Sequence, residues 1–331
     1  MGMGRVLRGM HAALVALGLG LLCGAAVAVD LQGHRGARGL APENTLAGFE
    51  LALAQGVSTL ELDLAVTRDG VLVVHHDLAL NPDLTRDAEG RWLDGPGPLI
   101  HALSLDDLQR YDVGRLRPGT SYASRYPEQR PVDGARVPRL SEAFELVRRR
   151  GDTEVHFAIE TKLDPRRPEA TPPPEVFARL VVDAVRAAGL ASRVSVLSFD
   201  WRTLQVIQRT APEIRTVYLT AQQRWLDNVG TGRDGASPWT AGFSLAEHGG
   251  SVPRLVHAAG GRIWSVFHGD LDAAKMKEAK ALGLQVLVWT VNDAPTMARM
   301  LDLGVDALIT DRPDIARNVM EPRGLWPPKV R

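Results

Sequence analysis

Cysteine is almost absent from the chain, because its 331 residues include only Cys23. A single thiol cannot form an intramolecular disulfide, so a disulfide-stabilised fold is excluded and stability must come from a packed core. An excess of basic charge is also absent, since 39 Lys and Arg residues balance 39 Asp and Glu residues. A neutral chain has no net attraction for a nucleic-acid backbone, and we exclude nucleic acid as a partner.

The residues that are abundant are those of a globular protein. Apolar residues make up 45% of the chain and charged residues 24%, which excludes a disordered or collagen-like chain. The length fits either two domains of about 150 residues or one α/β barrel of about 250 residues.

Residues 1–28 have the pattern of a secretory signal peptide. Arg5 and Arg8 precede an apolar stretch over 12–22, and Ala26-Val27-Ala28 forms a small-residue cleavage site. A membrane anchor is the alternative, but the stretch is shorter than the about 20 residues that span a bilayer. A lipoprotein at Cys23 is disfavoured because Leu22 occupies a position where a small residue is expected.

We therefore expect cleavage after Ala28 and export to the periplasm or the medium. Of 331 residues, 28 are lost and 303 remain, with a formal charge of −2 because two arginines leave with the signal peptide. The mature protein would have no cysteine and no stable membrane span. We expect one domain over 29–322 and a C-terminal tail over 323–331.

Short apolar or β-branched runs alternate with segments of helical period along this domain. This alternation is typical of a parallel sheet wrapped by helices, and eight strands make a TIM (β/α)8 barrel. The eight predicted strands are Leu31–His34, Thr59–Asp63, Val155–Glu160, Val194–Ser198, Thr216–Leu219, Ile263–Phe267, Val286–Trp289 and Ala307–Ile309.

A ninth run, Val71–His75, does not fit the parallel pattern. It follows 61–66 after only Thr67-Arg68-Asp69-Gly70, which is too short for the crossover helix that parallel strands need. We predict a hairpin over 64–75 that returns the chain to the barrel mouth near His76. Residues 87–138 are rich in Gly, Pro and Arg and are predicted to be an insertion before the third barrel strand, with a short helix over 104–111.

Three acidic residues fall at the ends of predicted barrel strands. Strand alternation puts Glu61 and Asp63 on one face of their strand, opposite three leucines, and it puts Glu160 and Lys162 on one face of the next strand. Three oxygen donors without a thiol suit one divalent cation, Ca²⁺ or Mg²⁺. The alternatives are an acidic solvent face on the first strand and a structural Glu160–Lys162 salt bridge on the second.

Two histidines are candidates for proton transfer. His34 and Arg35 follow the first strand, at the barrel end where active sites are built. A pair of imidazoles can accept a proton from a nucleophile and donate one to a leaving alkoxide, and an arginine can bind a phosphate oxygen.

Together, these motifs resemble the glycerophosphodiester phosphodiesterase family. The matching motifs occur in the family's order over most of 31–317 and are His34-Arg35-Gly36, Pro42-Glu43-Asn44-Thr45, Glu61-Leu62-Asp63, Asp69-Gly70, Val73-Val74-His75-His76-Asp77, Glu160-Thr161-Lys162, Ser198-Phe199-Asp200, Trp289-Thr290-Val291-Asn292 and Thr310-Asp311. The resemblance implies a TIM barrel of the phosphatidylinositol-phospholipase-C-like type.

The resemblance also implies roles for individual residues. Glu61, Asp63 and Glu160 match metal ligands, and His34 and His76 match the acid and base. We expect His75 to point away from the mouth. The positions matching substrate contacts are Arg35, Lys162, Glu43, Asn44, Phe199 and Trp289.

Some of these positions have a second interpretation. Asn44 or Thr45 could cap the helix that follows them, and Phe199 and Trp289 could be core residues. The implied reaction is metal-dependent hydrolysis of a small-molecule glycerophosphodiester to glycerol 3-phosphate and an alcohol. The alternatives are a related phospholipase-type lyase that forms a cyclic phosphate, and a binding protein without catalysis.

Overall fold

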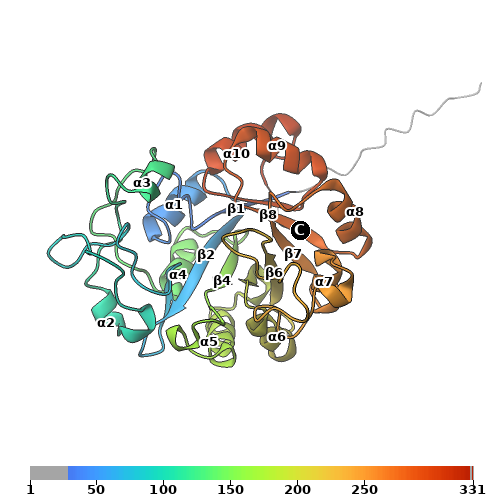
Figure 1. Ribbon diagram of the computed structural model, residues 1–331. Coiled ribbons are helices and arrows are strands. Elements are labelled where there is room, and N and C mark those ends of the chain that lie inside the picture. The colour runs from blue at the N-terminus through green and yellow to red at the C-terminus, as the bar shows by residue number, and fades with distance from the viewer. Residues whose placement is uncertain (1–28, 329, 331) are drawn as a thin grey trace, which may run out of the picture.

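Eight parallel strands form the centre of the computed structural model, which describes residues 29–328 and 330. β1 pairs with both β2 and β9, so the sheet closes on itself and the predicted TIM barrel is confirmed (Figure 1). The predicted signal peptide lies outside the described residues. The barrel strands are β1 (Asp30–Gly33), β2 (Thr59–Val66), β4 (His156–Thr161), β5 (Val194–Ser198), β6 (Arg215–Thr220), β7 (Ile263–Phe267), β8 (Gln285–Trp289) and β9 (Ala307–Thr310).

A helix follows each barrel strand and covers the outside of the sheet (Figure 1). Side-chain caps at Thr45, Asp200, Asp272 and Asp293 fix where four of these helices begin. Thr45, rather than Asn44, is the cap of the first helix. The outer helices are α1 (Leu46–Ala54), α4 (Leu140–Arg149), α5 (Pro174–Ala187), α6 (Trp201–Thr210), α7 (Val252–Ala258), α8 (Ala273–Ala281), α9 (Ala294–Leu303) and α10 (Pro313–Met320).

The connection between β2 and β4 contains the hairpin and the insertion. β3 (Leu72–Val74) pairs antiparallel with β2, with Leu64 opposite Val74, as the short turn predicts. The insertion contains η1 (Ile100–Ala102), α2 (Leu105–Leu108) and α3 (Ser121–Arg125), and α2 and α3 lie to one side of the barrel (Figure 1). It shares a small apolar core with the hairpin, in which Ile100, Leu108 and Val137 pack with Ala65 and Val73.

A second long connection, over 221–251, joins β6 to α7. It contains η4 (Ala246–His248), and the buried amide of Asn228 orders its first part. Asn228 accepts a hydrogen bond from the backbone N–H of Ala221 and donates to the carbonyl oxygens of Phe199 and Leu219. The remaining short helices are η2 (Pro168–Ala170), η3 (Ala191–Arg193) and η5 (Glu321–Arg323).

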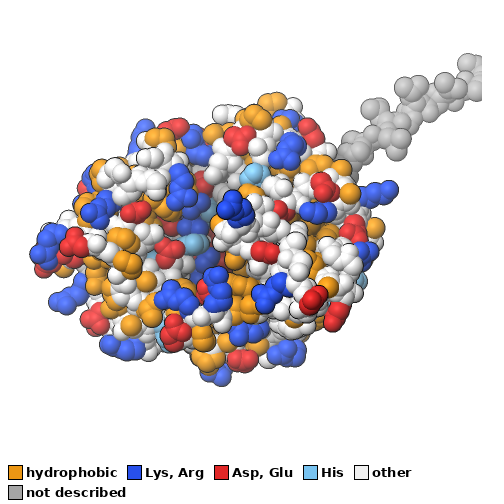
Figure 2. Space-filling view, viewed as in Figure 1, with side chains coloured by type: hydrophobic (Ala, Val, Ile, Leu, Met, Phe, Trp, Pro, Cys, Tyr) orange, Lys and Arg blue, Asp and Glu red, His pale blue; other side chains and the backbone are white. Residues whose placement is uncertain are grey.

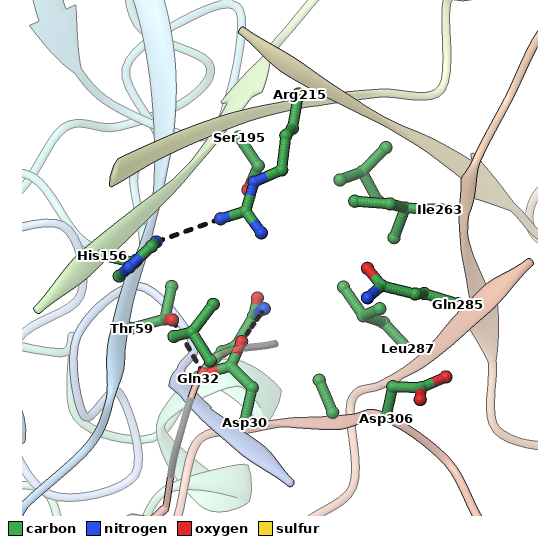
Figure 3. A pocket seen from close by; sticks show the side chains of 13 residues that line it. Asp30, Gln32, Thr59, His156, Ser195, Arg215, Ile263, Gln285, Leu287 and Asp306 are labelled. Atoms are coloured by element: carbon green, nitrogen blue, oxygen red, sulfur yellow. Dashed lines mark hydrogen bonds between the residues drawn. The ribbon is translucent and has the colours of Figure 1, made fainter. Parts of the chain in front are cut away.

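The two ends of the barrel differ in what fills them. An apolar layer that includes Ala158, Leu197, Val217 and Ile309 packs inside the barrel. At the N-terminal ends of the strands lies a polar cavity of about 30 Å³, where Asp30 and His156 are hydrogen-bonded to neighbouring side chains (Figure 3). The carboxyl ends of the strands surround a larger hollow. No helix within 29–328 is long and apolar enough to cross a membrane.

Candidate active site

The three predicted acids meet at the carboxyl ends of β2 and β4. The register pairs Asp63 with Glu160, and strand alternation brings Glu61 to the same side. One carboxylate oxygen from each residue lies within 4.8 Å of the others, and all three side chains are buried. Leu60, Leu62 and Leu64 belong to the outer apolar core, so the predicted alternation of β2 is confirmed.

The acidic trio, Glu61, Asp63 and Glu160, contains more buried negative charge than its neighbours balance. Burial and the two other carboxylates raise the pKa of Glu61 well above its usual range, and burial raises the pKa of Glu160 to about 7. The Arg35 guanidinium holds the pKa of Asp63 well below its usual range against the effect of burial. Asp63 Oδ1 is buried and has no hydrogen-bond partner among the described residues. A divalent cation fits this donor set, because it would supply the missing charge and coordinate that oxygen.

Lys162 lies beside the trio and forms the ion pair that the sequence offered as an alternative. Its Nζ is 2.6 Å from Glu160 Oε1 and 3.5 Å from Asp63 Oδ1. The pair is inside the mouth rather than on the outer surface, since both residues line the cavity. A salt bridge and a place at the site are therefore compatible roles for Lys162.

His34 lies between the acidic trio and an orienting carboxylate. Its Nδ1 is 2.7 Å from Asp311 Oδ1, and its Nε2 is 4.0 Å from Glu61 Oε2. Asp311 also accepts hydrogen bonds from the Arg38 guanidinium and from Asn292 Nδ2. Burial and the nearby Arg38 lower the pKa of His34 to about 4, so its imidazole is neutral near pH 7.

His76 has the same kind of support on the other side of the cavity. Its Nδ1 is 2.7 Å from Asp77 Oδ1, and Asn81 Nδ2 donates to the second oxygen of Asp77. Burial, together with Arg35 and Lys162, lowers the pKa of His76 to about 4. His75 Nδ1 contacts the carbonyl oxygen of Asp77, and His75 is not among the residues that line the cavity.

Glu43 and Asn44 lie behind the cavity and do not line it. Glu43 accepts a hydrogen bond from Arg35 Nη1 at 2.8 Å. Asn44 donates through Nδ2 to Asp63 Oδ2 at 2.9 Å. The backbones of Arg35 and Asn44 are both left-handed, with φ of 52° and 54°, a strained conformation that surrounding contacts must hold. The structure therefore gives these two predicted substrate contacts supporting positions.

Eight of the predicted site residues line one cavity of about 730 Å³, and Asp63 lies buried beside it. Phe199 and Trp289 line it with ring centroids 5.3 Å apart, and both also pack on the apolar layer of the barrel, so a place at the cavity and a place against the core are compatible. In Figure 2, a hollow near the middle of this face contains histidine and basic side chains. The predicted residues around the cavity are His34, Arg35, Glu61, His76, Glu160, Lys162, Phe199 and Trp289.

The sequence argument missed several residues at this end of the barrel. Asp311 was part of a matching motif but had no assigned role, although its position directly after the last strand was a usable signal. Tyr122 from α3 bonds to Glu43 and lies 3.2 Å from Arg38 Nη1, and no local pattern indicated this. The loop after β6 adds Trp225 and Trp239 to the cavity, again without a motif.

The fold and the site define a class of protein: a (β/α)8 barrel with a buried acidic trio, two carboxylate-supported histidines and basic groups at one mouth. The model of the glycerophosphoryl diester phosphodiesterase family matches residues 34–315. The chain belongs to this family, and the predicted family and enzyme class are confirmed.

Known relatives cover nearly the whole chain. A glycerophosphodiester phosphodiesterase from Caldanaerobacter subterraneus is 26% identical over 88% of this chain and 97% of its own. The crystal structure of a proposed glycerophosphoryl diester phosphodiesterase from Silicibacter pomeroyi is 34% identical, with a TM-score of 0.79, over 92% of this chain and 96% of its own. A phosphodiesterase from Oleispira antarctica, solved with sn-glycerol 3-phosphate, is 22% identical, covers 89% of this chain and 97% of its own, and has a TM-score of 0.62, a similarity of fold.

Proposed function

We propose that this protein is an exported, metal-dependent enzyme that hydrolyses glycerophosphodiesters to glycerol 3-phosphate and an alcohol. The observation that carries the proposal is a cluster of three buried carboxylates, within 4.8 Å of one another, of which Glu61 and Glu160 line one cavity together with His34 and His76. The phosphodiesterase relatives support the reaction class.

Glu61, Asp63 and Glu160 are the proposed ligands of one Ca²⁺ or Mg²⁺ ion, because all their donors are oxygen. When bound, the ion would stabilise negative charge on the phosphoryl oxygens. The positively charged side chains of Arg35 and Lys162 also lie beside the trio, where both form ion pairs with Asp63. Their guanidinium and ammonium groups would orient the phosphodiester and offset the charge that grows in the transition state.

The two histidines are the proposed proton-transfer groups. His34 donates a hydrogen bond from Nδ1–H to the Asp311 carboxylate, which leaves Nε2 free to accept a proton from the attacking hydroxyl group. As the new P–O bond forms, the bond to the leaving alcohol breaks, and His76 gives its proton to the departing oxygen. A bound phosphodiester adds negative charge near His76 and favours its protonated form.

The test is a coupled assay for released glycerol 3-phosphate across several glycerophosphodiesters. We expect activity that a chelator abolishes and that Ca²⁺ or Mg²⁺ restores. An unchanged rate after exhaustive chelation would refute the metal site. A stable cyclic phosphate as the final product, seen by phosphorus NMR, would instead assign the protein to the lyases.

Export is the second part of the proposal, and its support is the signal-peptide pattern of residues 1–28. We expect N-terminal sequencing of the exported protein to begin at Val29. A mature protein that retains Met1 would contradict cleavage. A palmitate-labelled protein beginning at Cys23 would favour the lipoprotein alternative.

A further inference from the structure

Arg125 is a cation at the cavity that has no role in the proposed reaction. It is the last residue of α3, on the insertion, and it lines the same cavity as His34, His76 and Lys162. Its guanidinium lies 4.5 Å from the ring centre of Tyr122, so a cation–π contact orients the charge. The insertion therefore brings a positive charge to the mouth of the barrel.

Arg125 differs from the other lysine and arginine side chains around the cavity, because each of those has a carboxylate partner. Arg125 forms no ion pair within the part of the chain that the structure describes, and its side chain is exposed. A cation without a counter-ion at the entrance of a cavity attracts an anionic ligand. The ion pairs of the other cations are Arg35–Glu43, Arg38–Asp311, Lys162–Glu160 and Arg166–Asp164.

The segment that carries Arg125 is anchored to the barrel on its C-terminal side. Gln129 Nε2 donates a hydrogen bond to the carbonyl oxygen of Arg38 at 2.7 Å. Glu128 Oε1 lies 2.8 Å from Arg312 Nη1, in the loop after the last barrel strand. These contacts hold the cation at one place beside the cavity. A charge that is held in position by its surroundings loses less entropy when it binds a ligand.

The position of Arg125 connects it with the groups beside the leaving alcohol. Arg125 stacks on Tyr122, Tyr122 bonds to Glu43, and Glu43 lines a small cavity together with His76. In the proposed function, His76 protonates the oxygen of the departing alcohol. All glycerophosphodiesters share the glycerol and the reacting phosphate, and they differ in the alcohol. A charge that Arg125 recognises selectively must therefore belong to the alcohol.

We propose that Arg125 is a specificity-determining residue that binds an oxyanion on the alcohol, so that the enzyme prefers glycerophosphodiesters of anionic alcohols to those of cationic alcohols. This inference rests on the proposed function, because the preferred substrate reacts at the same phosphorus. A guanidinium can bind a carboxylate or a phosphate through two parallel N–H donors. It repels an ammonium group at the same place. Arg125 takes no part in the bond changes.

A series of substrates that differ in charge but hardly in size tests the proposal in the full-length enzyme. Release of glycerol 3-phosphate is measured from the glycerophosphodiesters of 3-hydroxypropionate, 1,3-propanediol and 3-aminopropanol, which are anionic, neutral and cationic alcohols. We expect kcat/KM to fall about fivefold at each step in that order, the factor that corresponds to about 1 kcal/mol for an exposed charge pair. Equal values or the reverse order overturn the Arg125 proposal alone, whereas inactivity on all three substrates overturns the proposed function.

Two variants locate the effect on Arg125. Arg125→Gln should lower the ratio of kcat/KM for the anionic substrate to that for the cationic substrate at least fivefold, and Arg125→Lys, which keeps the charge, should retain most of the ratio. Arg130→Gln is the matched control, because Arg130 is an exposed cation of the same segment that forms no ion pair with a described residue and does not line the cavity. Intrinsic differences in substrate reactivity cancel when the ratios are compared. An unchanged ratio in Arg125→Gln overturns the proposal, and so does an equal fall in Arg130→Gln, which would show an effect of net charge.

Discussion

The two ends of this barrel hold polar side chains in different ways. At the N-terminal end, Asp30 accepts hydrogen bonds from three neighbouring side chains around a cavity of about 30 Å³. At the carboxyl end, Asp63 Oδ1 is buried without a hydrogen-bond partner in the described part of the chain, and the pKa of Glu61 is raised well above its usual range. At the first end the Asp30 carboxylate is fully engaged by neighbouring donors and only a neutral atom, Gln32 Oε1, lacks a partner among the described residues, whereas the second end leaves charge for a ligand to balance.

The N-terminal end of the barrel therefore contributes to stability, and the carboxyl end provides the groups for the reaction. A buried carboxylate that neighbouring donors already satisfy stabilises the barrel without a ligand, while an unbalanced buried cluster favours whatever supplies the missing charge. Substitutions of the same chemical type at the two ends should therefore have opposite consequences. The following predictions test that contrast, beginning with the largest effect.

Glu61→Gln should lower the turnover rate by about 10³-fold or more. The amide keeps the size of the side chain but removes one anionic ligand, and a metal ion contributes several kcal/mol to the stabilisation of transition-state charge. The melting temperature without added metal should not fall, because the substitution removes repulsion with Asp63 and Glu160. Steady-state kinetics and thermal unfolding measure the two effects, and a variant with parental turnover would remove Glu61 from the site.

His34→Ala and His76→Ala should each lower kcat by roughly 10²- to 10⁴-fold, the usual contribution of a proton-transfer group. Neither should unfold the protein, since both side chains line the cavity rather than the apolar core. Circular dichroism checks the fold, and single-turnover kinetics check the chemical step. If either variant keeps a near-parental rate, that histidine does not transfer a proton in the reaction.

Tyr122→Phe should have a smaller effect, roughly tenfold on kcat with little change in KM. The phenol joins the insertion to Glu43 and Arg38, and loss of such a supporting contact commonly reduces activity 10- to 100-fold. Tyr126→Phe is the matched control, because it keeps the ring that lies 4.9 Å from the Arg38 guanidinium. Equal losses in the two variants would mean that the insertion supports the fold only.

The parts of the site that the sequence predicts are those set by strand geometry. Glu61, Asp63 and Glu160 follow from a two-residue alternation and from the pairing of adjacent strands, and both are local properties of the chain. The same reasoning predicted the hairpin, since four residues cannot form a crossover helix. The number of barrel strands was predictable because eight short apolar runs alternate with segments of helical period.

The missed residues depend on how distant loops dock. Tyr122 reaches Glu43 only because the insertion packs beside the first barrel loop, where the Arg130 backbone N–H bonds to the Leu40 carbonyl. Trp225 reaches the mouth because Asn228 and Asp270 fix the loop after β6. Asn44 and Thr45 were both possible helix caps by residue type, and only tertiary contacts distinguish them. Asn44 binds Asp63, and Thr45 caps the helix.

Asp30→Asn applies the same carboxylate-to-amide change at the other end of the barrel. It should lower the free energy of unfolding by about 1–3 kcal/mol, because the new amide N–H₂ faces hydroxyl and amide donors. Turnover should stay at the parental value. Urea unfolding and the glycerol 3-phosphate assay measure the two quantities. A large loss of activity without a loss of stability would contradict the conclusion that the N-terminal end contributes to stability alone.

The smallest predicted effect is a pH dependence of stability at the N-terminal end. His156 Nδ1 accepts a hydrogen bond from Arg215 Nη2 at 3.0 Å, and burial followed by the Arg215 charge lowers the pKa of His156 from 6.5. The unfolded chain therefore binds more protons below that pH, so this contribution to stability is present above pH 6.5 and is lost as the pH falls. His156→Gln keeps an acceptor that does not titrate, so the difference in unfolding free energy between the parent and the variant should change between pH 8 and 5. The other titrating groups are present in both chains and cancel in that difference, so a pH-independent difference would show that His156 does not contribute.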